Sequence, residues 1–193
     1  KVAKSSMQDL SAMQKEYEAN YAELSAMQKK IQAELLDIYK NLNTSNEAYV
    51  GGEMMWPVPG YSKISSYYGW RFNNTDFHTG VDITGSGVHG APVVAANTGT
   101  VVHTKVCPYN GYSYGYGTYI IVDHGGGVTS LYAHCSKLLV SEGQTVKKGQ
   151  IIGYIGSTGR STGAHLHFGL MINGSWVNPM NYLSKPANLP IYG

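Results

Sequence analysis

Glycine is distributed very unevenly along this sequence, and that distribution constrains the fold more than any other feature. All 24 glycines lie beyond residue 50, and residues 1–42 contain neither glycine nor proline. Glycine and proline interrupt helices and mark turns, so the first part can form one uninterrupted helix, whereas the rest must form short elements joined by turns. All 7 histidines and both cysteines also lie beyond residue 50. We therefore look for chemistry in the second part.

Apolar residues recur through the first part at helical spacing, with a mean step of about 3.5 residues. The segment Ser11–Lys15 also returns as Ser25–Lys29, two heptads later. Residues 1–48 are therefore predicted to be an amphipathic helical segment. We expect it to form a coiled coil with a partner or by self-association through residues 7–42, and packing on its own domain is the alternative. The apolar series is Leu10, Met13, Tyr17, Tyr21, Leu24, Met27, Ile31, Leu35, Ile38 and Leu42.

The composition changes near residue 50, first to polar, then to glycine-rich and finally to proline-bounded sequence. This change predicts a linker over residues 49–58. Beyond it, short β-branched or aromatic runs alternate with glycine turns, and Asp123–Gly127 and Asn173-Gly174 have the composition of hairpin turns. We predict a mainly β fold over residues 59–183, an antiparallel sheet or barrel-like domain, followed by a C-terminal tail over residues 184–193.

Overall composition excludes some classes of function. Charged residues make up 13% of the chain and the net charge is +2, too little for a nucleic-acid footprint. No apolar run approaches the roughly 20 residues that a membrane-spanning helix needs. We expect no nucleic-acid partner and no membrane span in this chain.

Two local patterns in the β part place histidines near one another or near a carboxylate. His165 and His167 flank Leu166 in an apolar run, so both imidazoles project from one face of a strand. His78 stands four residues before Asp82, with Gly80 expected to let the backbone turn between them. Two imidazoles and one carboxylate form a zinc ligand set that leaves a fourth position open for water. A further histidine could then carry a proton to and from the reacting groups.

Several stretches resemble the lysostaphin-like zinc endopeptidases of bacterial peptidoglycan. They include Phe77–Ile83, Gly90–Val93, Leu131–His134, Lys148–Gln150 and Gly156–Phe168, and they follow the family's order over most of residues 56–181. The resemblance implies a zinc metallo-endopeptidase, a hydrolase acting on peptidoglycan peptides in cell-wall remodelling or cell separation. It also implies an extracytoplasmic location, either secreted or associated with the cell wall.

The resemblance further implies roles for individual residues. His78, Asp82 and His167 would hold one Zn²⁺, while His134 and His165 would act as general base and as stabiliser of the oxyanion, with their division of labour left open. Helical segments in such relatives regulate access to the active site. We therefore expect residues 1–48 to position or restrain the β domain.

Other functions remain open at this point. A noncatalytic wall-binding or activator module would keep the same fold, although the presence of all five site residues favours the enzyme. Residues 142–153 resemble half of a biotinyl or lipoyl carrier domain, but the acceptor-lysine motif of such domains is absent. The helical segment could also be the main functional part, with the β domain as a passive cap.

Some further residues are open to two interpretations. Cys107 and Cys135 could form a disulfide, or Cys135 could be a small buried apolar residue. The Tyr- and Gly-rich residues 108–117 could contact substrate or form an exposed ribbon, whereas residues 156–163, which lead into the histidine pair, are predicted to be a groove wall. His103 is expected on a strand surface and His124 on a hairpin turn.

Overall fold

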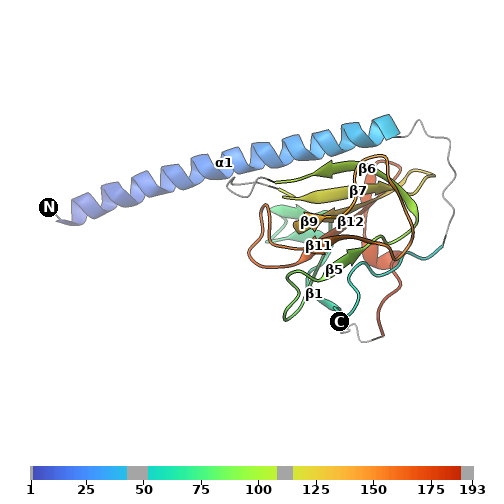
Figure 1. Cartoon of the computed structure of the whole chain (residues 1–193). Coiled ribbons are helices and arrows are strands. Elements are labelled where there is room, and N and C mark those ends of the chain that lie inside the picture. The colour runs from blue at the N-terminus through green and yellow to red at the C-terminus, as the bar shows by residue number, and fades with distance from the viewer. Residues whose placement is uncertain (1, 43–51, 108–114, 188–193) are drawn as a thin grey trace.

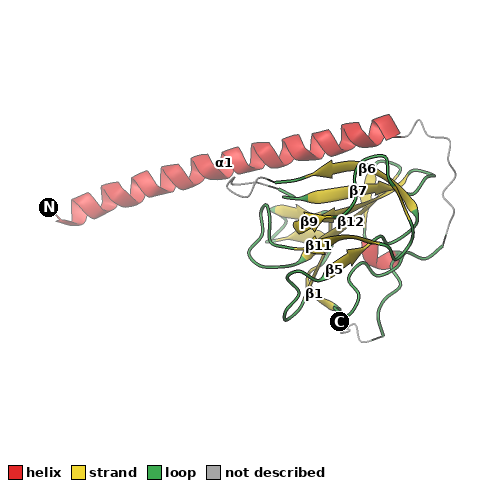
Figure 2. Cartoon of the chain, viewed as in Figure 1, coloured by secondary structure: helices red, strands yellow, loops and turns green. Residues whose placement is uncertain are grey.

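The computed structural model describes residues 2–42, 52–107 and 115–187 of the chain. One helix, α1 (Val2–Leu42), precedes a β domain, by which we mean the described residues from 52 onward. Figure 1 and Figure 2 show α1 reaching far beyond the β domain at its N-terminal end, while its C-terminal part lies along the sheet. The absence of glycine and proline from this stretch permits a helix of 41 residues.

Most strands of the β domain form a single antiparallel sheet. Its order is β1-β4-β12-β8-β7-β6-β10, with β13 paired to β12. Its strands are β1 (Lys63–Ser66), β4 (Gly80–Thr84), β6 (Gly99–Lys105), β7 (Tyr119–Asp123), β8 (Val128–Ala133), β10 (Thr145–Val146), β12 (Leu166–Ile172) and β13 (Ser175–Val177). Both predicted hairpins are confirmed, because β7 pairs with β8 across residues 124–127 and β12 pairs with β13 across Asn173-Gly174.

Two smaller sheets and a short helix complete the domain. One sheet has the order β5-β11-β9, and β2 and β3 form a separate hairpin. Their bounds are β2 (Gly69–Arg71), β3 (Asp76–His78), β5 (Pro92–Val94), β9 (Cys135–Leu138) and β11 (Ile151–Ile155), and a 3-10 helix, η1, spans Pro179–Asn181.

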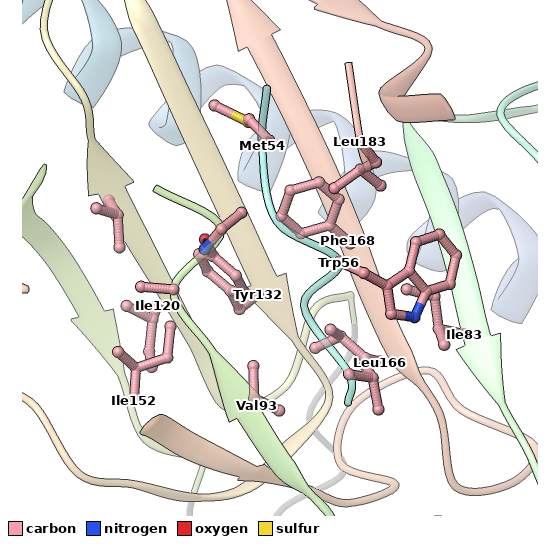
Figure 3. Close-up of a cluster of buried hydrophobic side chains, with 14 of the residues drawn as sticks. Met54, Trp56, Ile83, Val93, Ile120, Tyr132, Ile152, Leu166, Phe168 and Leu183 are labelled. Atoms are coloured by element: carbon pink, nitrogen blue, oxygen red, sulfur yellow. Dashed lines mark hydrogen bonds between the residues drawn. The ribbon is translucent and has the colours of Figure 1, made fainter. Parts of the chain in front are cut away.

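The main core lies between the large sheet and the β5-β11-β9 sheet. Ile120 and Phe168 from the large sheet belong to the same buried cluster as Val93 and Ile152 from the small one (Figure 3). Because the small sheet covers the core, the large sheet has no need to close on itself. It ends in short edge strands, β1 and β10, and the barrel-like part of our prediction is wrong.

The segment before β1 also belongs to the core. Met54, Trp56 and Val58 are buried, and Met54 pairs with Leu183 near the other end of the domain (Figure 3). The linker predicted over residues 49–58 therefore overlaps the β domain, since its apolar residues close one side of the core. Residues 43–51 and 188–193 lie outside the described residues, so the domain boundaries themselves stay a prediction.

The apolar stripe of α1 divides into two parts. Leu35 is buried in a second cluster with Tyr119, Ile121 and Leu131, and Ile31 packs against that cluster. Leu10, Met13, Tyr17 and Tyr21 on the same stripe are exposed. The helix thus packs on its own domain through its C-terminal part, the alternative that the sequence left open, and the coiled-coil partner stays a prediction. None of the described residues forms a helix long and apolar enough to cross a membrane.

Candidate metal centre

Three polar side chains converge where β3, β4 and β12 meet. Nε2 of His78, Oδ1 of Asp82 and Nδ1 of His167 lie 2.9 to 3.0 Å from one another. We call these residues the ligand triad. The register of the sheet brings them together, because Asp82 on β4 is the direct cross-strand partner of His167 on β12, and His78 ends β3 just before β4 begins.

Gly80 has a different role from the turn that the sequence suggested. It lies within β4 and pairs with Gly169 of β12. A Cβ at Gly80 would come within 2.3 Å of the Phe168 carbonyl oxygen and within 2.9 Å of Cε1 of His167. The missing side chain therefore lets β4 and the His167 ring approach each other.

The donor set fits a zinc ion. Nδ1 of His78 donates to the Tyr67 carbonyl oxygen (2.9 Å), so in the neutral imidazole Nε2 keeps the lone pair that a bound cation would accept. Tetrahedral ligands about 2.0–2.1 Å from Zn²⁺ lie about 3.3 Å apart, close to the spacing of the ligand triad. Two histidines and one carboxylate leave a coordination position open, as in catalytic sites.

The pKa shifts favour the ionisation states that metal binding requires. Burial alone would raise the pKa of Asp82, but hydrogen bonds and charge from His167 and His78 outweigh burial and hold that pKa below its usual range. Burial lowers the pKa of His167. The carboxylate is therefore anionic at neutral pH, and burial shifts His167 toward its neutral form; these are the forms that bind a divalent metal.

His134 and His165 flank the ligand triad without belonging to it. Their ring centroids lie 4.6 Å apart, and Nε2 of His165 is 3.8 Å from Oδ1 of Asp82. Nδ1 of His134 donates to the Thr158 carbonyl (2.7 Å) and Nδ1 of His165 donates to the Gly163 carbonyl (2.8 Å). Each histidine consequently keeps the lone pair of Nε2 available to accept a proton.

The backbone of His134 is held in an unusual conformation. Its φ is 63°, a left-handed value uncommon for residues other than glycine, and it stands between β8 and β9. Its N–H donates to the Tyr116 carbonyl (3.0 Å). Burial, together with His167 and His165, lowers the pKa of His134 to about 3, so its imidazole is neutral at physiological pH.

A pocket of about 290 Å³ opens over these side chains, and we call it the central pocket. Residues 160–162 form part of its wall, which confirms the prediction for the 156–163 loop. Ile31 of α1 and Tyr116 also line it. Tyr116 belongs to the segment 108–117 that the sequence offered as a substrate contact, whereas no sequence signal placed Ile31 at this site. The apolar spacing of a helix predicts that one face is packed but not which surface it packs against, so only the tertiary structure places Ile31 at this pocket. A second hollow shares Thr162 and His165 with the central pocket.

The remaining candidate residues lie elsewhere. His124 lies in the β7–β8 hairpin turn, as expected, but its ring is buried and hydrogen-bonded to the Thr98 carbonyl and to Ser130 inside the domain. His103 is partly exposed on β6, as expected, and faces Glu142.

Cys107 and Cys135 are free thiols, so the disulfide interpretation is not supported. Cys135 is fully buried, and burial raises its pKa to about 12. It therefore fits the alternative of a small buried apolar residue. Residues 108–114 of the predicted substrate loop lie outside the described residues.

Comparison with known proteins identifies the family to which this site belongs. A family model described as peptidase family M23 matches residues 76–179, more than half of the 193-residue chain. The chain belongs to peptidase family M23. The matched stretch contains all of the ligand triad as well as His134 and His165.

Two curated M23 relatives are similar to the β domain. The DD-carboxypeptidase/endopeptidase Mpg of Neisseria meningitidis is 40% identical over 125 residues, 63% of this chain and 27% of that protein. The peptidoglycan DD-endopeptidase ShyA of Vibrio cholerae is 40% identical over 119 residues, 62% of this chain and 23% of that protein. The chain thus spans about a quarter of the length of these relatives.

Solved structures show the same M23 fold. A zinc containing peptidase from Vibrio cholerae has a TM-score of 0.57 and 32% identity, covering 72% of this chain and 41% of that one. The catalytic domain of lysostaphin from Staphylococcus simulans has a TM-score of 0.54 and 38% identity, covering 63% of this chain and 91% of that domain. The resemblance to lysostaphin-like enzymes is confirmed.

Proposed function

We propose that this chain is a zinc-dependent endopeptidase that hydrolyses peptide bonds in peptidoglycan stem peptides or cross-bridges. The observation that carries the proposal is the convergence of the ligand triad at 2.9 to 3.0 Å beside two further histidines with free Nε2 lone pairs. These groups share one open pocket. Such a pocket admits a polymer that a closed cavity would exclude.

Each residue has a definite task in this proposal. His78, Asp82 and His167 hold the metal. When bound, Zn²⁺ supplies Lewis acidity for the scissile carbonyl and lowers the pKa of water to about 7. His134 and His165 divide two tasks between them. One accepts the proton of the attacking water at Nε2 and returns it to the leaving amine, a transfer that contributes roughly 10²–10⁴-fold to the rate, and the other stabilises the oxyanion.

The class of substrate follows from the relatives and the shape of the site. ShyA is named as a peptidoglycan DD-endopeptidase, and the two hollows that meet at His165 provide room for chain on both sides of the scissile bond. We infer that the protein acts outside the cytoplasm, where peptidoglycan is found, in cell-wall remodelling or cell separation.

We also propose that α1 restrains access to the central pocket. Ile31 lines that pocket together with the ligand triad, and Leu35 one turn later is buried against the sheet. The helix therefore narrows the pocket at a fixed position. Its release would widen the entrance without disturbing the metal ligands.

Mass spectrometry of fragments released from purified peptidoglycan tests the activity. Zinc-loaded protein is compared with Asp82→Asn, which removes the anionic ligand, and with Asp123→Asn, a carboxylate control in a hairpin outside the site. New peptide termini with wild type and the control, but not with Asp82→Asn, are expected and would identify the bond cut.

The result that contradicts the proposal is zinc-loaded protein that releases no fragments even when α1 is loosened by Leu35→Ala. Retained wall binding in that case would identify a noncatalytic wall-binding or activator module with the same fold.

A further inference from the structure

The two histidine ligands of the triad are supported in different ways at their outward nitrogens. Nδ1 of His78 donates to a backbone carbonyl, that of Tyr67 (2.9 Å). Nε2 of His167 instead faces a side chain, with Oγ1 of Thr79 at 3.5 Å, the long limit of a hydrogen bond. The Thr79 hydroxyl is in turn hydrogen-bonded to the Tyr116 hydroxyl (2.8 Å). Nδ1 of His78 also has Oγ of Ser66 at 3.4 Å, but its shorter contact is to the backbone and survives any side-chain substitution, whereas the contact of His167 Nε2 is to a side chain.

Tyr116 also packs against the His167 ring directly. The two ring centroids lie 5.2 Å apart at an interplanar angle of 42°. Cε1 of His167 lies close to Gly80, where an added Cβ would approach it within 2.9 Å. The imidazole thus has little freedom to rotate, and its Nε2 faces Thr79.

The backbone around Tyr116 is itself held from several directions. The Tyr116 carbonyl accepts from the His134 N–H (3.0 Å), and the Gly115 carbonyl accepts from the Arg160 N–H (2.9 Å). Ile31 of α1 lies against Gly115, where an added Cβ would come within 2.5 Å of its Cδ1. The phenol is consequently attached to a braced segment rather than to a free loop end.

We propose that Tyr116, acting through Thr79, is a positioning residue that holds His167 in the orientation required for metal binding. This inference rests on the proposed function, because it takes His167 as a zinc ligand. Burial raises the pKa of Tyr116 to about 12, so the hydroxyl keeps its proton throughout the physiological range. Outer partners of this kind change metal affinity by about 10- to 100-fold when they are removed.

The test is the zinc dissociation constant of the full chain, measured by competition with a chromophoric chelator. Tyr116→Phe keeps the ring packing but removes the hydroxyl, and Thr79→Val removes the other hydroxyl at nearly constant shape. Each is expected to weaken zinc binding by about 10- to 100-fold. Thr79→Ser keeps a hydroxyl and should bind zinc with near wild-type affinity. The double variant of Tyr116→Phe and Thr79→Val should bind zinc no more weakly than the weaker-binding single variant, because both hydroxyls act through the same contact with His167.

Tyr154→Phe is the matched control, because it removes a tyrosine hydroxyl on β11, outside the central pocket. Cobalt-substituted protein gives a second readout, in which Tyr116→Phe and Thr79→Val should shift the visible absorption bands and Thr79→Ser should not. If Tyr116→Phe does not fold, the comparison of Thr79→Val with Thr79→Ser tests the inference by itself.

Zinc dissociation constants of Tyr116→Phe and Thr79→Val within twofold of the wild-type value would overturn the inference. Equal weakening by Thr79→Ser and Thr79→Val would do so as well, because a general loss of packing would then explain it. Failure of the wild-type chain to bind zinc would instead refute the proposed function on which the inference rests.

Discussion

Leu35→Ala should loosen α1 from the β domain and can be compared with an almost ideal control one residue away. Among the helix side chains that the structure describes, Leu35 alone is buried, at 3% exposure, whereas Leu36 is 39% exposed. Both substitutions replace leucine by alanine at neighbouring helical positions, so differences in helix propensity cancel. The comparison isolates the contact of Leu35 with Tyr119, Ile121 and Leu131.

The size of the effect follows from that burial. Truncating a buried leucine to alanine costs about 2–5 kcal/mol, and Leu35 sits at the helix–sheet boundary, which can relax, so we expect about 2–4 kcal/mol. Since about 1.4 kcal/mol corresponds to a tenfold change, the undocked fraction of α1 should rise roughly 30- to 900-fold. Leu36→Ala should change it by less than about tenfold.

Limited trypsin digestion measures this fraction, because Lys29 and Lys30 are exposed on α1 but must leave the helical conformation to be cleaved. Cleavage there should accelerate in Leu35→Ala while the β domain stays intact. Fragment release from peptidoglycan should rise in parallel if α1 restrains the central pocket. Equal cleavage rates for Leu35→Ala and Leu36→Ala would refute the docking argument, and faster cleavage with unchanged release would refute the restraint alone.

Three further predictions concern the β domain. His134→Ala should keep stoichiometric zinc, measured by metal analysis, but lose roughly 10²–10⁴-fold in turnover, whereas His103→Ala, outside the pocket, should change neither. Gly80→Ala should lower the free energy of unfolding by about 1–3 kcal/mol in urea titrations because its Cβ collides with β12, while Gly163→Ala, with open space around it, should not. Burial lowers the pKa of His124 below 6.5, so only the unfolded chain binds this proton as the pH falls below 6.5. Stability should therefore fall there by at most about 1.4 kcal/mol per pH unit, and His124→Gln should show a shallower slope.

Local patterns in the sequence predicted much of the β domain because they depend on short-range chemistry. Turn composition located the hairpins at residues 123–127 and 173–174, and strand alternation placed His165 and His167 on the side opposite the buried Leu166. Neither pattern contains the pairing of β4 with β12. The sheet register that makes Asp82 the neighbour of His167 depends on contacts between residues far apart in the chain.

The helix α1 shows that a local pattern can predict an element without predicting what it packs against. Its apolar spacing predicted the element correctly but is the same whether the stripe meets another helix or a sheet. In the structure, the apolar stripe of α1 is packed at one end and exposed at the other. Ile31 and Leu35 contact the β domain, while Leu10, Met13, Tyr17 and Tyr21 are exposed. The spacing of side chains determines a face, and the shape of the neighbouring surface determines what that face covers.

The contacts that support His167 depend on both a local sequence motif and a contact between residues far apart in the chain. Thr79 lies inside the His78–Asp82 motif, yet its hydroxyl has no obvious partner until Tyr116, 37 residues later, is brought within 2.8 Å. Tyr116 is placed there by hydrogen bonds with the segments that carry His134 and Arg160. In the folded chain, the backbone of His134, the groove wall at Arg160 and the ring of His167 are therefore all in contact with the same two residues, Gly115 and Tyr116. Displacing that short segment should disturb metal affinity and turnover together, whereas His134→Ala should disturb turnover alone.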